Sequence, residues 1–400
     1  MKRRNFLRTT GLVGLPLLTS PLTASVTQML QSLVDPESDR VLVLVQLSGG
    51  NDGLNTLVPL DQYDNLAAVR SNILVPRNTL LNLNATQAFN PNMTGMRALF
   101  DQGQLGIVQA AGYPNQNRSH FRSTDIWTSA SDANQVVSTG WLGRHFQDSQ
   151  PTYPTDYPNA EYPAPFAIAM GSQVSQTCQG VGINFSLAVN DPFNVTSLAV
   201  GGDTPLPATP YGNELGFLRT SIAQTNAYGG YVQDRAEAGS NAVSYPSSRF
   251  ATTLRNVASM ISGGLETKVY IVSLGGFDTH ANQIMAGDST QGTHAELLTT
   301  ISDGLAAFHA DLAAQNLGER VISMTFSEFG RRIRSNASLG TDHGSAAPLF
   351  LLGSCVNPGV LGQSPEISPA ADVNEGGCHA IRLPGHLRQR VSRLVWAASR

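Results

Sequence analysis

Two short segments of this sequence combine a carboxylate with a histidine. Asp342 stands directly before His343 and a glycine, and Asp278 stands two residues before His280. Carboxylate oxygens and imidazole nitrogens are ligands for divalent metals, and neighbouring side chains in extended backbone point opposite ways. Asp342 and His343 are therefore suited to facing two metals rather than one. A solvated turn is the alternative, and it would be the better interpretation of an isolated Asp-His-Gly segment.

Three further stretches place polar residues where a ligand would be bound. Asp52 lies in the turn GGNDG after the apolar run 40–47, and Glu328 follows the apolar run 321–326. Ser119 is expected at the start of a helix, where backbone N–H groups and the helix dipole favour an anionic nucleophile or a bound oxyanion. Structural alternatives stay open, namely a simple Gly/Asn turn at Asp52 and an N-cap at Ser119.

The elements that would position these residues alternate between strands and helices. Four apolar runs have the character of strands buried on both faces, at residues 40–47, 105–111, 269–274 and 321–326. Three segments have helical spacing, at residues 213–238, 249–260 and 293–316. This alternation predicts an α/β fold with a mainly parallel sheet, whose ligands bind at the carboxyl ends of the strands. The acids and histidines follow strand ends, which is the ligand chemistry of a two-metal hydrolase.

The remaining histidines and the cysteines carry weaker signals. His294 begins the helix predicted at 293–316 and is placed to reach the site, whereas His309 is expected on the surface or in a groove. The three cysteines show no CxxC spacing, which gives no indication of a zinc ribbon or a redox motif. Cys178 and Cys355 would be able to pair in an oxidising compartment, although their spacing does not require it.

Residues 1–24 have the pattern of a twin-arginine export signal. Arg3 and Arg4 precede an apolar, charge-free run that ends in small residues near Ala24. That run is too short and too polar for a stable membrane span. We therefore expect passage through the twin-arginine export machinery to the periplasm or the cell exterior, with an ordinary basic N-terminus as the alternative.

Charge and composition narrow the class of protein. The signal holds four basic residues and no acid, so the rest of the chain has 25 − 4 = 21 basic against 29 acidic residues, a net charge of −8. Such a balance argues against nucleic acid as a partner. With 41% apolar residues, the chain is able to bury a large core. We predict one domain over 25–374, in which the Pro-, Tyr- and Gly-rich segment 149–245 forms an irregular cap over the site.

Five ordered segments resemble the DUF1501 family of exported bacterial proteins. These segments are GGNDGLNTLVP, NRSHFRSTDIW, GGFDTHANQ, SEFGRR and GTDHG. The family is grouped with the alkaline phosphatase/sulfatase superfamily. The resemblance therefore implies a three-layer α/β/α fold with a mainly parallel, alkaline-phosphatase-like sheet. It extends from the export signal to residue 374.

The resemblance also implies roles for individual residues. Divalent metal ions (zinc, calcium, magnesium or manganese) would be bound by Asp52, Asp278, His280, Asp342 and His343. Ser119 would be the attacking nucleophile, and Arg118 or Arg122 would hold the anionic group of the substrate. Glu328 and His294 would be additional residues near the site.

Two departures from the superfamily pattern leave the activity open. The superfamily spaces its middle acid and histidine as DxxxH, whereas Asn282 stands at that place here and His280 comes earlier. A further C-terminal metal histidine has no counterpart. The expected function is metal-dependent hydrolysis of a phosphate or sulfate ester in a small molecule or polysaccharide. The alternative is a catalytically inactive envelope or polysaccharide-binding protein that retains the fold, and a purely structural secreted protein is a third class.

The C-terminal segment 375–400 is not expected to be the native end of this family. It is rich in arginine, has a single acid and lacks the apolar helix that should close such a sheet. Codons compatible with residues 378–396, read one nucleotide forward, encode AMQYDFRAIYASVSRDWF, which resembles the end of DUF1501 proteins. We therefore predict that an insertion or deletion near codons 374–377 shifted the reading frame. Resequencing the gene tests this prediction, and an intact frame would refute it.

Overall fold

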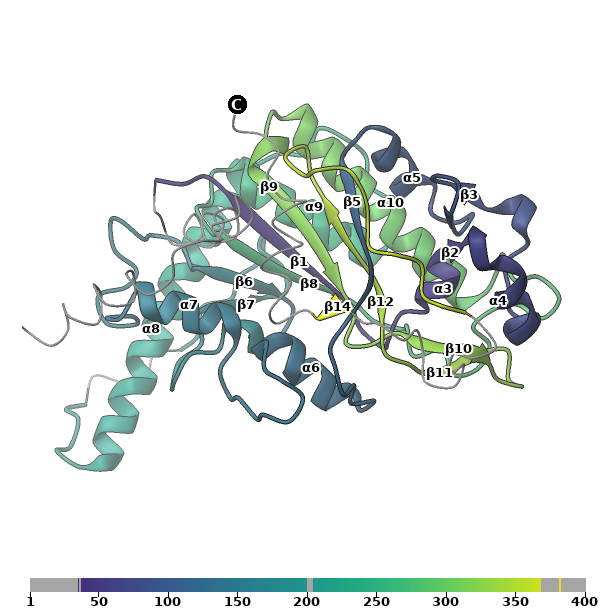
Figure 1. Cartoon of the computed structure of the whole chain (residues 1–400). Helices are drawn as coiled ribbons and strands as arrows, with labels where there is room; N and C mark the ends of the chain where they lie inside the picture. The colour runs from purple at the N-terminus through teal and green to yellow at the C-terminus, as the bar shows by residue number, and fades with distance from the viewer. Residues whose placement is uncertain (1–34, 36, 200–203, 368–380, 383–400) are drawn as a thin grey trace, which may run out of the picture.

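A computed structural model of the chain describes residues 35, 37–199, 204–367 and 381–382 (Figure 1). The export signal predicted at 1–24 and nearly all of the predicted frameshifted tail at 375–400 lie outside the described residues, so both stay predictions. Within the described part, no helix combines the length and the hydropathy that crossing a bilayer would need.

A nine-stranded sheet forms the centre of the molecule, in the order β13-β5-β12-β9-β1-β8-β6-β7, with β14 paired to β5. The strands are β1 (Val41–Leu47), β5 (Leu105–Gly112), β6 (Ala167–Met170), β7 (Ser186–Val189), β8 (Val269–Leu274), β9 (Val321–Phe326), β12 (Ala347–Leu352), β13 (Gly359–Leu361) and β14 (Ile381–Arg382). Every pairing is parallel except those of β12, which runs antiparallel between β5 and β9. The predicted mainly parallel sheet is confirmed.

Strand β1 shows why the sheet is covered on both faces. Val43 and Val45 belong to one hydrophobic core, while Leu42 and Leu44 belong to the other. Because successive side chains point to opposite faces of a strand, an unbroken Val/Leu run can be buried only when both faces are packed.

Helices form the two outer layers (Figure 1). The first core packs against α5 (Thr94–Asp101), the C-terminal part of α8 (Pro210–Ala238), α9 (Arg249–Ser262) and α10 (Thr293–Ala314). The second core packs against α6 (His120–Ser129) and α7 (Trp141–Ser149). The predicted three-layer α/β/α architecture is therefore confirmed. The other end of α8 extends away from the body of the molecule (Figure 1).

Smaller elements surround one end of the sheet. They are α3 (Gly53–Thr56), β2 (Leu57–Pro59), α4 (Tyr63–Arg70), β3 (Leu81–Asn82), β4 (Gln87–Phe89) and the antiparallel hairpin of β10 (Arg331–Ser335) and β11 (Thr341–His343). The described residues also include four 3-10 helices, η1 (Leu60–Gln62), η2 (Arg77–Thr79), η3 (Gln176–Cys178) and η4 (Gly318–Arg320). Ile333 of β10 packs with α4 in a separate small core, which fixes the hairpin beside the main sheet.

Segment 149–245 differs from the predicted irregular cap. It supplies β6 and β7, which extend the main sheet beyond β8 as parallel edge strands. Its helix α8 packs against α9 through Val232 and Ala236. The FAIAM stretch at 166–170 has the composition of a short strand, but so short a stretch does not indicate whether it joins the main sheet.

Two expectations about polar core residues are also corrected. His309 is buried rather than exposed, with its Nε2 atom 3.0 Å from Ser323 Oγ on β9. Since α9 and the sheet enclose that face of α10, a histidine there needs a polar partner. Cys178 and Cys355 are both free thiols, and burial raises the pKa of each. The disulfide considered from the sequence is therefore not formed.

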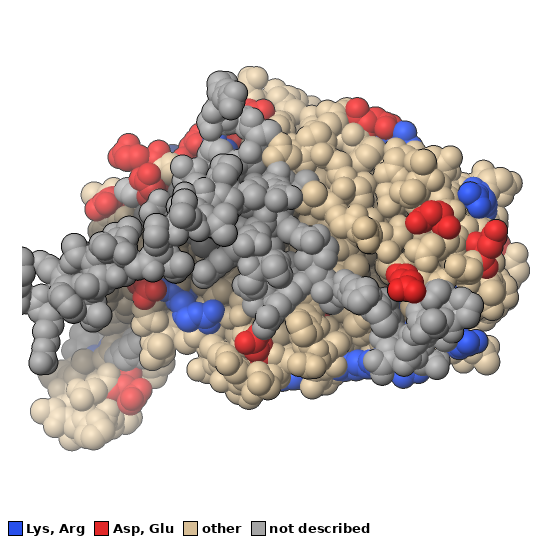
Figure 2. All heavy atoms as spheres, in the orientation of Figure 1, with Lys and Arg blue, Asp and Glu red and all other residues tan. Residues whose placement is uncertain are grey.

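Charged residues are scattered on the face shown in Figure 2. Lysine and arginine do not gather into a broad basic patch on the described part of that face (Figure 2). The picture agrees with the excess of acidic over basic residues in the chain.

Candidate metal centre

The carboxyl ends of four parallel strands meet at one edge of the sheet. Strands β5, β9, β1 and β8 run in the same direction, and the hairpin β10–β11 lies beside their ends. The side chains that contact one another there are His120, Asp278, His280, Glu328, Asp342 and His343. A site at this edge is expected from the sequence, and five of these six residues, all except His120, are predicted site residues.

Three imidazole rings surround one carboxylate oxygen. The Nε2 atoms of His343, His280 and His120 lie 3.1, 3.2 and 3.5 Å from Asp278 Oδ1. The Nε2 atoms of His280 and His343 are 2.8 Å apart. The side chain of Asp278 is 49% exposed, so this cluster is open to a ligand from solvent.

The other ring nitrogen of each histidine faces an oxygen acceptor. The Nδ1–oxygen pairs are His120 with Glu328 Oε1 at 2.8 Å, His280 with Asp342 Oδ1 at 3.2 Å, and His343 with the Arg118 carbonyl at 2.8 Å. A carbonyl and an ionised carboxylate only accept hydrogen bonds, so each Nδ1 atom must donate one. In a neutral ring, this hydrogen bond from Nδ1 leaves a lone pair on Nε2, the atom that lies near Asp278 Oδ1 in each of the three histidines.

This arrangement calls for a positive charge at the centre of the cluster. The Nε2 atoms of His280 and His343 lie 2.8 Å apart, so either a shared proton or a bound cation must separate their lone pairs. A metal-bound histidine characteristically donates its other N–H to a carboxylate or a carbonyl, which is the pattern at all three rings. Among the described residues, His120, Asp278 and His343 offer ligand atoms within 4.8 Å of one another. The donor set therefore fits a divalent metal.

The buried guanidinium of Arg331 connects the segments that carry the cluster. It donates to the carbonyls of Gly50 at 2.7 Å, Thr341 at 2.8 Å and Phe277 at 2.9 Å, and to Asp278 Oδ1 at 2.7 Å. Partial burial alone would raise the pKa of Asp278, but the hydrogen bond and the positive charge of Arg331 outweigh it and lower the pKa to about 2. Asp278 is therefore ionised at neutral pH.

Gly49 permits the turn after β1 to approach the segment that carries Asp278 closely. Its φ is +122°, and a Cβ atom there would lie 2.3 Å from the backbone nitrogen of Asp278. Its own N–H donates to Glu328 Oε1 at 2.8 Å, the same oxygen that faces His120. A side chain at this position would separate the Asp278 segment from the turn after β1.

The structure does not bring Asp52 into the cluster. Both carboxylate oxygens of this fully buried residue are bound by Arg70 Nη1, at 3.0 and 2.9 Å, and Gln283 Nε2 donates to one of them at 2.6 Å. Arg70 is also fully buried, and it donates to the carbonyls of Ile333 and Arg332. The cation beside Asp52 is therefore a guanidinium, so this geometry gives no support for Asp52 as a metal ligand.

His294 also lies outside the cluster. Its Nε2 atom is 3.0 Å from Asn51 Oδ1, and its side chain is buried. Desolvation lowers the pKa of His294 to about 4, so the ring is neutral. It takes part in the buried polar network around Asp52 and does not replace the missing C-terminal histidine.

Ser119 is placed beside the cluster by its position in the chain. It is the exposed N-cap of α6, directly before His120, and its side chain makes no capping hydrogen bond. The guanidinium of Arg122 instead donates to the carbonyls of Ala133 and Gln135, which holds the loop after α6. Arg118 contributes its backbone carbonyl to His343.

Sequence reasoning missed His120, Arg331 and Arg332 as site residues. His120 carried a usable signal, since it follows the carboxyl end of β5 as Asp278 follows β8. Arg332 is one-third exposed, and its Nη1 atom lies 3.5 Å from Asp342 Oδ2. The Arg-Arg pair gave no indication of which guanidinium is buried, because that depends on the pairing of β10 with β11.

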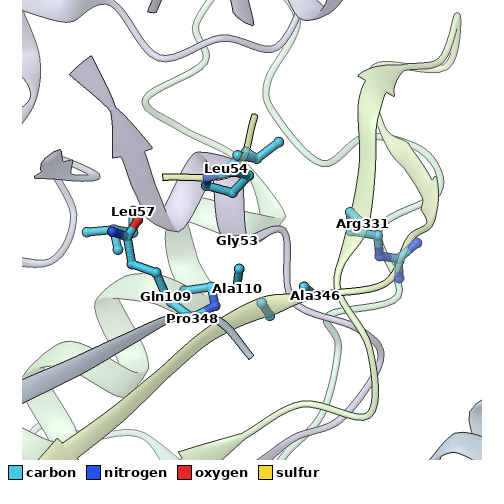
Figure 3. Close-up of a pocket in the computed structure, with 10 residues that line it drawn as sticks. Gly53, Leu54, Leu57, Gln109, Ala110, Arg331, Ala346 and Pro348 are labelled. Atoms are coloured by element: carbon cyan, nitrogen blue, oxygen red, sulfur yellow. The ribbon is translucent and has the colours of Figure 1, made fainter. Parts of the chain in front are cut away.

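Arg331 also borders a separate pocket (Figure 3). Leu54, Gln109, Ala110 and Pro348 line it, with Arg331 opposite Gln109 (Figure 3). The buried Nε2 atom of Gln109 has no hydrogen-bond partner among the described residues. None of the three histidines lines this pocket, so the candidate site is the open cluster around Asp278.

Replacing Glu328 with glutamine is expected to weaken metal binding about 10- to 100-fold. This is the usual effect of losing the group that accepts a hydrogen bond from a metal-bound histidine. The change keeps the size of the buried side chain but removes the charge that faces His120 Nδ1. Isothermal titration of the metal-free protein measures the effect. Glu296→Gln, in the first turn of α10, is the control, and equal affinities for wild type and Glu328→Gln would contradict the assignment.

The fold and the site define an α/β/α protein with a histidine–carboxylate cluster at the carboxyl edge of its sheet. Residues 252–381 match the family model described as "Protein of unknown function (DUF1501)", which agrees with the resemblance of the sequence segments to that family. The matched segment carries Asp278, His280, Glu328, Asp342 and His343. No curated protein matches the chain.

Two solved structures have a similar arrangement of elements. PsFucS1 sulfatase from Pseudoalteromonas sp. has a TM-score of 0.36 and 9% identity, with 88% of this chain and 70% of that chain covered. The lipoteichoic acid synthase LtaP from Listeria monocytogenes has a TM-score of 0.28 and 8% identity, with 80% of this chain and 67% of that chain covered.

Proposed function

We propose that this protein is an exported, metal-dependent hydrolase that cleaves a phosphate or sulfate ester in a small molecule or polysaccharide. The observation that carries the proposal is the convergence of three imidazole Nε2 atoms on Asp278 Oδ1. A divalent ion bound there would act as a Lewis acid that stabilises developing charge on the ester oxygens. His120, His280, His343 and Asp278 would hold this ion.

Ser119 is the nucleophile in this proposal. Its exposed side chain is adjacent in sequence to His120 and stands at the N-terminus of α6. The first N–H groups and the dipole of that helix favour an anionic oxygen at this place. Ser119 Oγ would lose its proton to solvent and form a bond to the phosphorus or sulfur atom while the bond to the alcohol oxygen breaks, and the alcohol would leave with a proton from solvent. Water would then cleave the ester on Ser119, which releases phosphate or sulfate and restores the hydroxyl group.

Arg332 is the guanidinium best placed to bind the anionic group of a substrate. Its Nη1 atom is only weakly paired with Asp342, at 3.5 Å, and its Nε atom has no partner among the described residues. Asp342 in turn contacts His280, so Arg332 borders the cluster. A guanidinium offers paired donors that match the geometry of a phosphate or sulfate group.

Replacing Arg332 with alanine is expected to raise KM for the ester about 10- to 100-fold, the effect of one lost hydrogen-bond pair to a charged group. The kcat should change much less, because the cluster itself is retained. Arg334→Ala is the control, since Arg334 is an exposed arginine two residues further along β10. Equal effects of the two substitutions on KM would contradict the role of Arg332.

Turnover of 4-nitrophenyl phosphate and 4-nitrophenyl sulfate by metal-free and metal-loaded protein tests the proposed function. Metal-dependent release of 4-nitrophenol that is lost in Ser119→Ala and Asp342→Ala would support the hydrolase. Turnover that is unchanged in Ser119→Ala would remove the serine from the mechanism.

The second candidate is an inactive polysaccharide-binding protein that retains the fold. The guanidinium of Arg70 beside Asp52 favours it, because a two-metal site that uses Asp52 is not assembled. Metal binding without turnover of either ester, together with retention on an immobilised acidic polysaccharide, would favour this candidate over the hydrolase.

A further inference from the structure

We infer that the centre binds one transition-metal ion of the zinc class through His120, His280, His343 and Asp278, and discriminates against calcium and magnesium. This inference deepens the proposed metal-dependent function and rests on the metal centre of that proposal. It assigns His120 as a ligand, and it makes Asp342 a supporting residue rather than a ligand.

The chemistry of the donor set carries the choice of metal. Three of the four converging atoms are imidazole nitrogens and one is a carboxylate oxygen. Calcium takes six to eight oxygen ligands, and magnesium requires an octahedral set of oxygens, whereas zinc is commonly bound by four nitrogen, oxygen or sulfur atoms. Imidazole-rich sites suit zinc and neighbouring transition metals.

Four of the six separations among these atoms are close to those around a tetrahedral ion. Ligands at the Zn–N distance of about 2.0–2.1 Å lie about 3.3 Å from one another in a tetrahedron. The corresponding separations are 2.8 Å between the Nε2 atoms of His280 and His343, and 3.1, 3.2 and 3.5 Å from the three rings to Asp278 Oδ1. His120, Asp278 and His343 offer ligand atoms within 4.8 Å of one another, and the ring of His280 would have to move toward His120 to complete the tetrahedron.

The surrounding hydrogen bonds separate ligands from supporting residues. Asp342 Oδ1 faces His280 Nδ1 at 3.2 Å and Asn336 Nδ2 at 3.4 Å, while its Oδ2 atom faces Arg332 at 3.5 Å. Asp342 thereby orients His280, as Glu328 orients His120. A zinc-bound histidine donates a hydrogen bond from its other ring nitrogen to such a carboxylate.

The environment of Asp52 indicates a single ion. Its carboxylate is enclosed by Arg70 and Gln283 at hydrogen-bond distance, and no part of it is exposed. A second divalent ion would have to displace a buried guanidinium that also binds the carbonyls of Ile333 and Arg332. Among the described residues, the cluster around Asp278 is therefore the site where we expect the ion to bind.

Equilibrium dialysis of chelator-stripped protein against zinc, cobalt, calcium or magnesium chloride tests the inference, with bound metal measured by mass spectrometry. We expect one zinc or cobalt ion per chain and no retained calcium or magnesium at millimolar concentration. The cobalt protein should show the intense visible absorption of a tetrahedral ion. Two ions per chain, or retention of calcium or magnesium in preference to zinc, would overturn the inference.

Single substitutions identify the ligands. His120→Ala is expected to reduce zinc affinity at least 100-fold, while His145→Ala, a histidine in α7, leaves it unchanged. Circular dichroism of the metal-free variants checks that each is folded. If a variant does not fold, the metal preference and the number of ions bound by the wild-type protein still test the inference. None of these measurements uses turnover. Zinc binding without ester hydrolysis would therefore refute the proposed hydrolase activity and would still support the inference about the metal.

Discussion

Asp278→Asn protein is expected to lose zinc affinity by at least about 100-fold and ester hydrolysis by about 1,000-fold, because a bound metal contributes several kcal/mol of charge stabilisation. Asp278 is the one negative charge among the four converging groups, and its Oδ1 atom is the point that all three Nε2 atoms face. An asparagine oxygen would still accept the hydrogen bond from Arg331, so the fold should be preserved.

The Asp278 prediction is checked by metal titration together with steady-state turnover. Asp125→Asn is the matched control, because Asp125 is an exposed acid on α6 with no part in the cluster. A variant at Asp278 that keeps full metal affinity would show that the carboxylate is not a ligand. If the variant keeps its metal affinity but loses turnover, Asp278 acts in the reaction and not in metal binding.

The second large effect is expected on stability rather than on metal binding. Asp52→Ala should lower the free energy of unfolding by about 3–5 kcal/mol, the cost of leaving one partner of a buried ion pair uncompensated. Arg70 would then remain as a guanidinium with no exposed surface and no counter-ion. Denaturant unfolding measures this loss.

A surface ion pair provides the control for the Asp52 prediction. Arg97 and Asp101 are partly exposed and four residues apart on α5, so Asp101→Ala should cost less than about 1 kcal/mol. The double variant Asp52→Ala/Arg70→Met should be more stable than Asp52→Ala, since it removes the unpaired charge. Loss of metal from Asp52→Ala without loss of stability would restore Asp52 as a ligand.

The ion pair of Asp52 with Arg70 also makes the free energy of unfolding depend on pH. Burial alone would raise the pKa of Asp52, but Arg70, His294 and Gln283 outweigh it, so the pKa lies below the usual value of an aspartate. A carboxyl whose pKa is lower in the folded state stabilises the fold above its unfolded pKa. That contribution is lost as the pH falls through the lower, folded pKa, and Asp52→Asn should flatten the acid limb of the stability curve.

The positions of the strands could be predicted because buried parallel strands have an unmistakable composition. VYIVSL and VISMTF are strands with the predicted bounds, β8 (Val269–Leu274) and β9 (Val321–Phe326). A strand enclosed on both faces must be apolar at every position. From these strands, the rule that ligands bind at carboxyl ends located Asp278, His280 and Glu328 correctly at one edge of the sheet.

The partner of Asp52 could not be predicted in the same way. Arg70 is the last residue of α4, a short helix with no apolar stripe or motif that would mark its end for burial. Its guanidinium is buried because Ile333 and the small sheet β2–β4 enclose the space between α4 and β10. Such a long-range pairing depends on tertiary packing rather than on any local pattern.

Diffraction from crystals grown with zinc, recorded on both sides of the zinc absorption edge, tests the central claim most directly. We expect one anomalous peak per chain, bound by the Nε2 atoms of His120, His280 and His343 and by the carboxylate of Asp278. A peak bound by Asp52, or zinc-soaked crystals that show no peak among these three rings, would contradict the account.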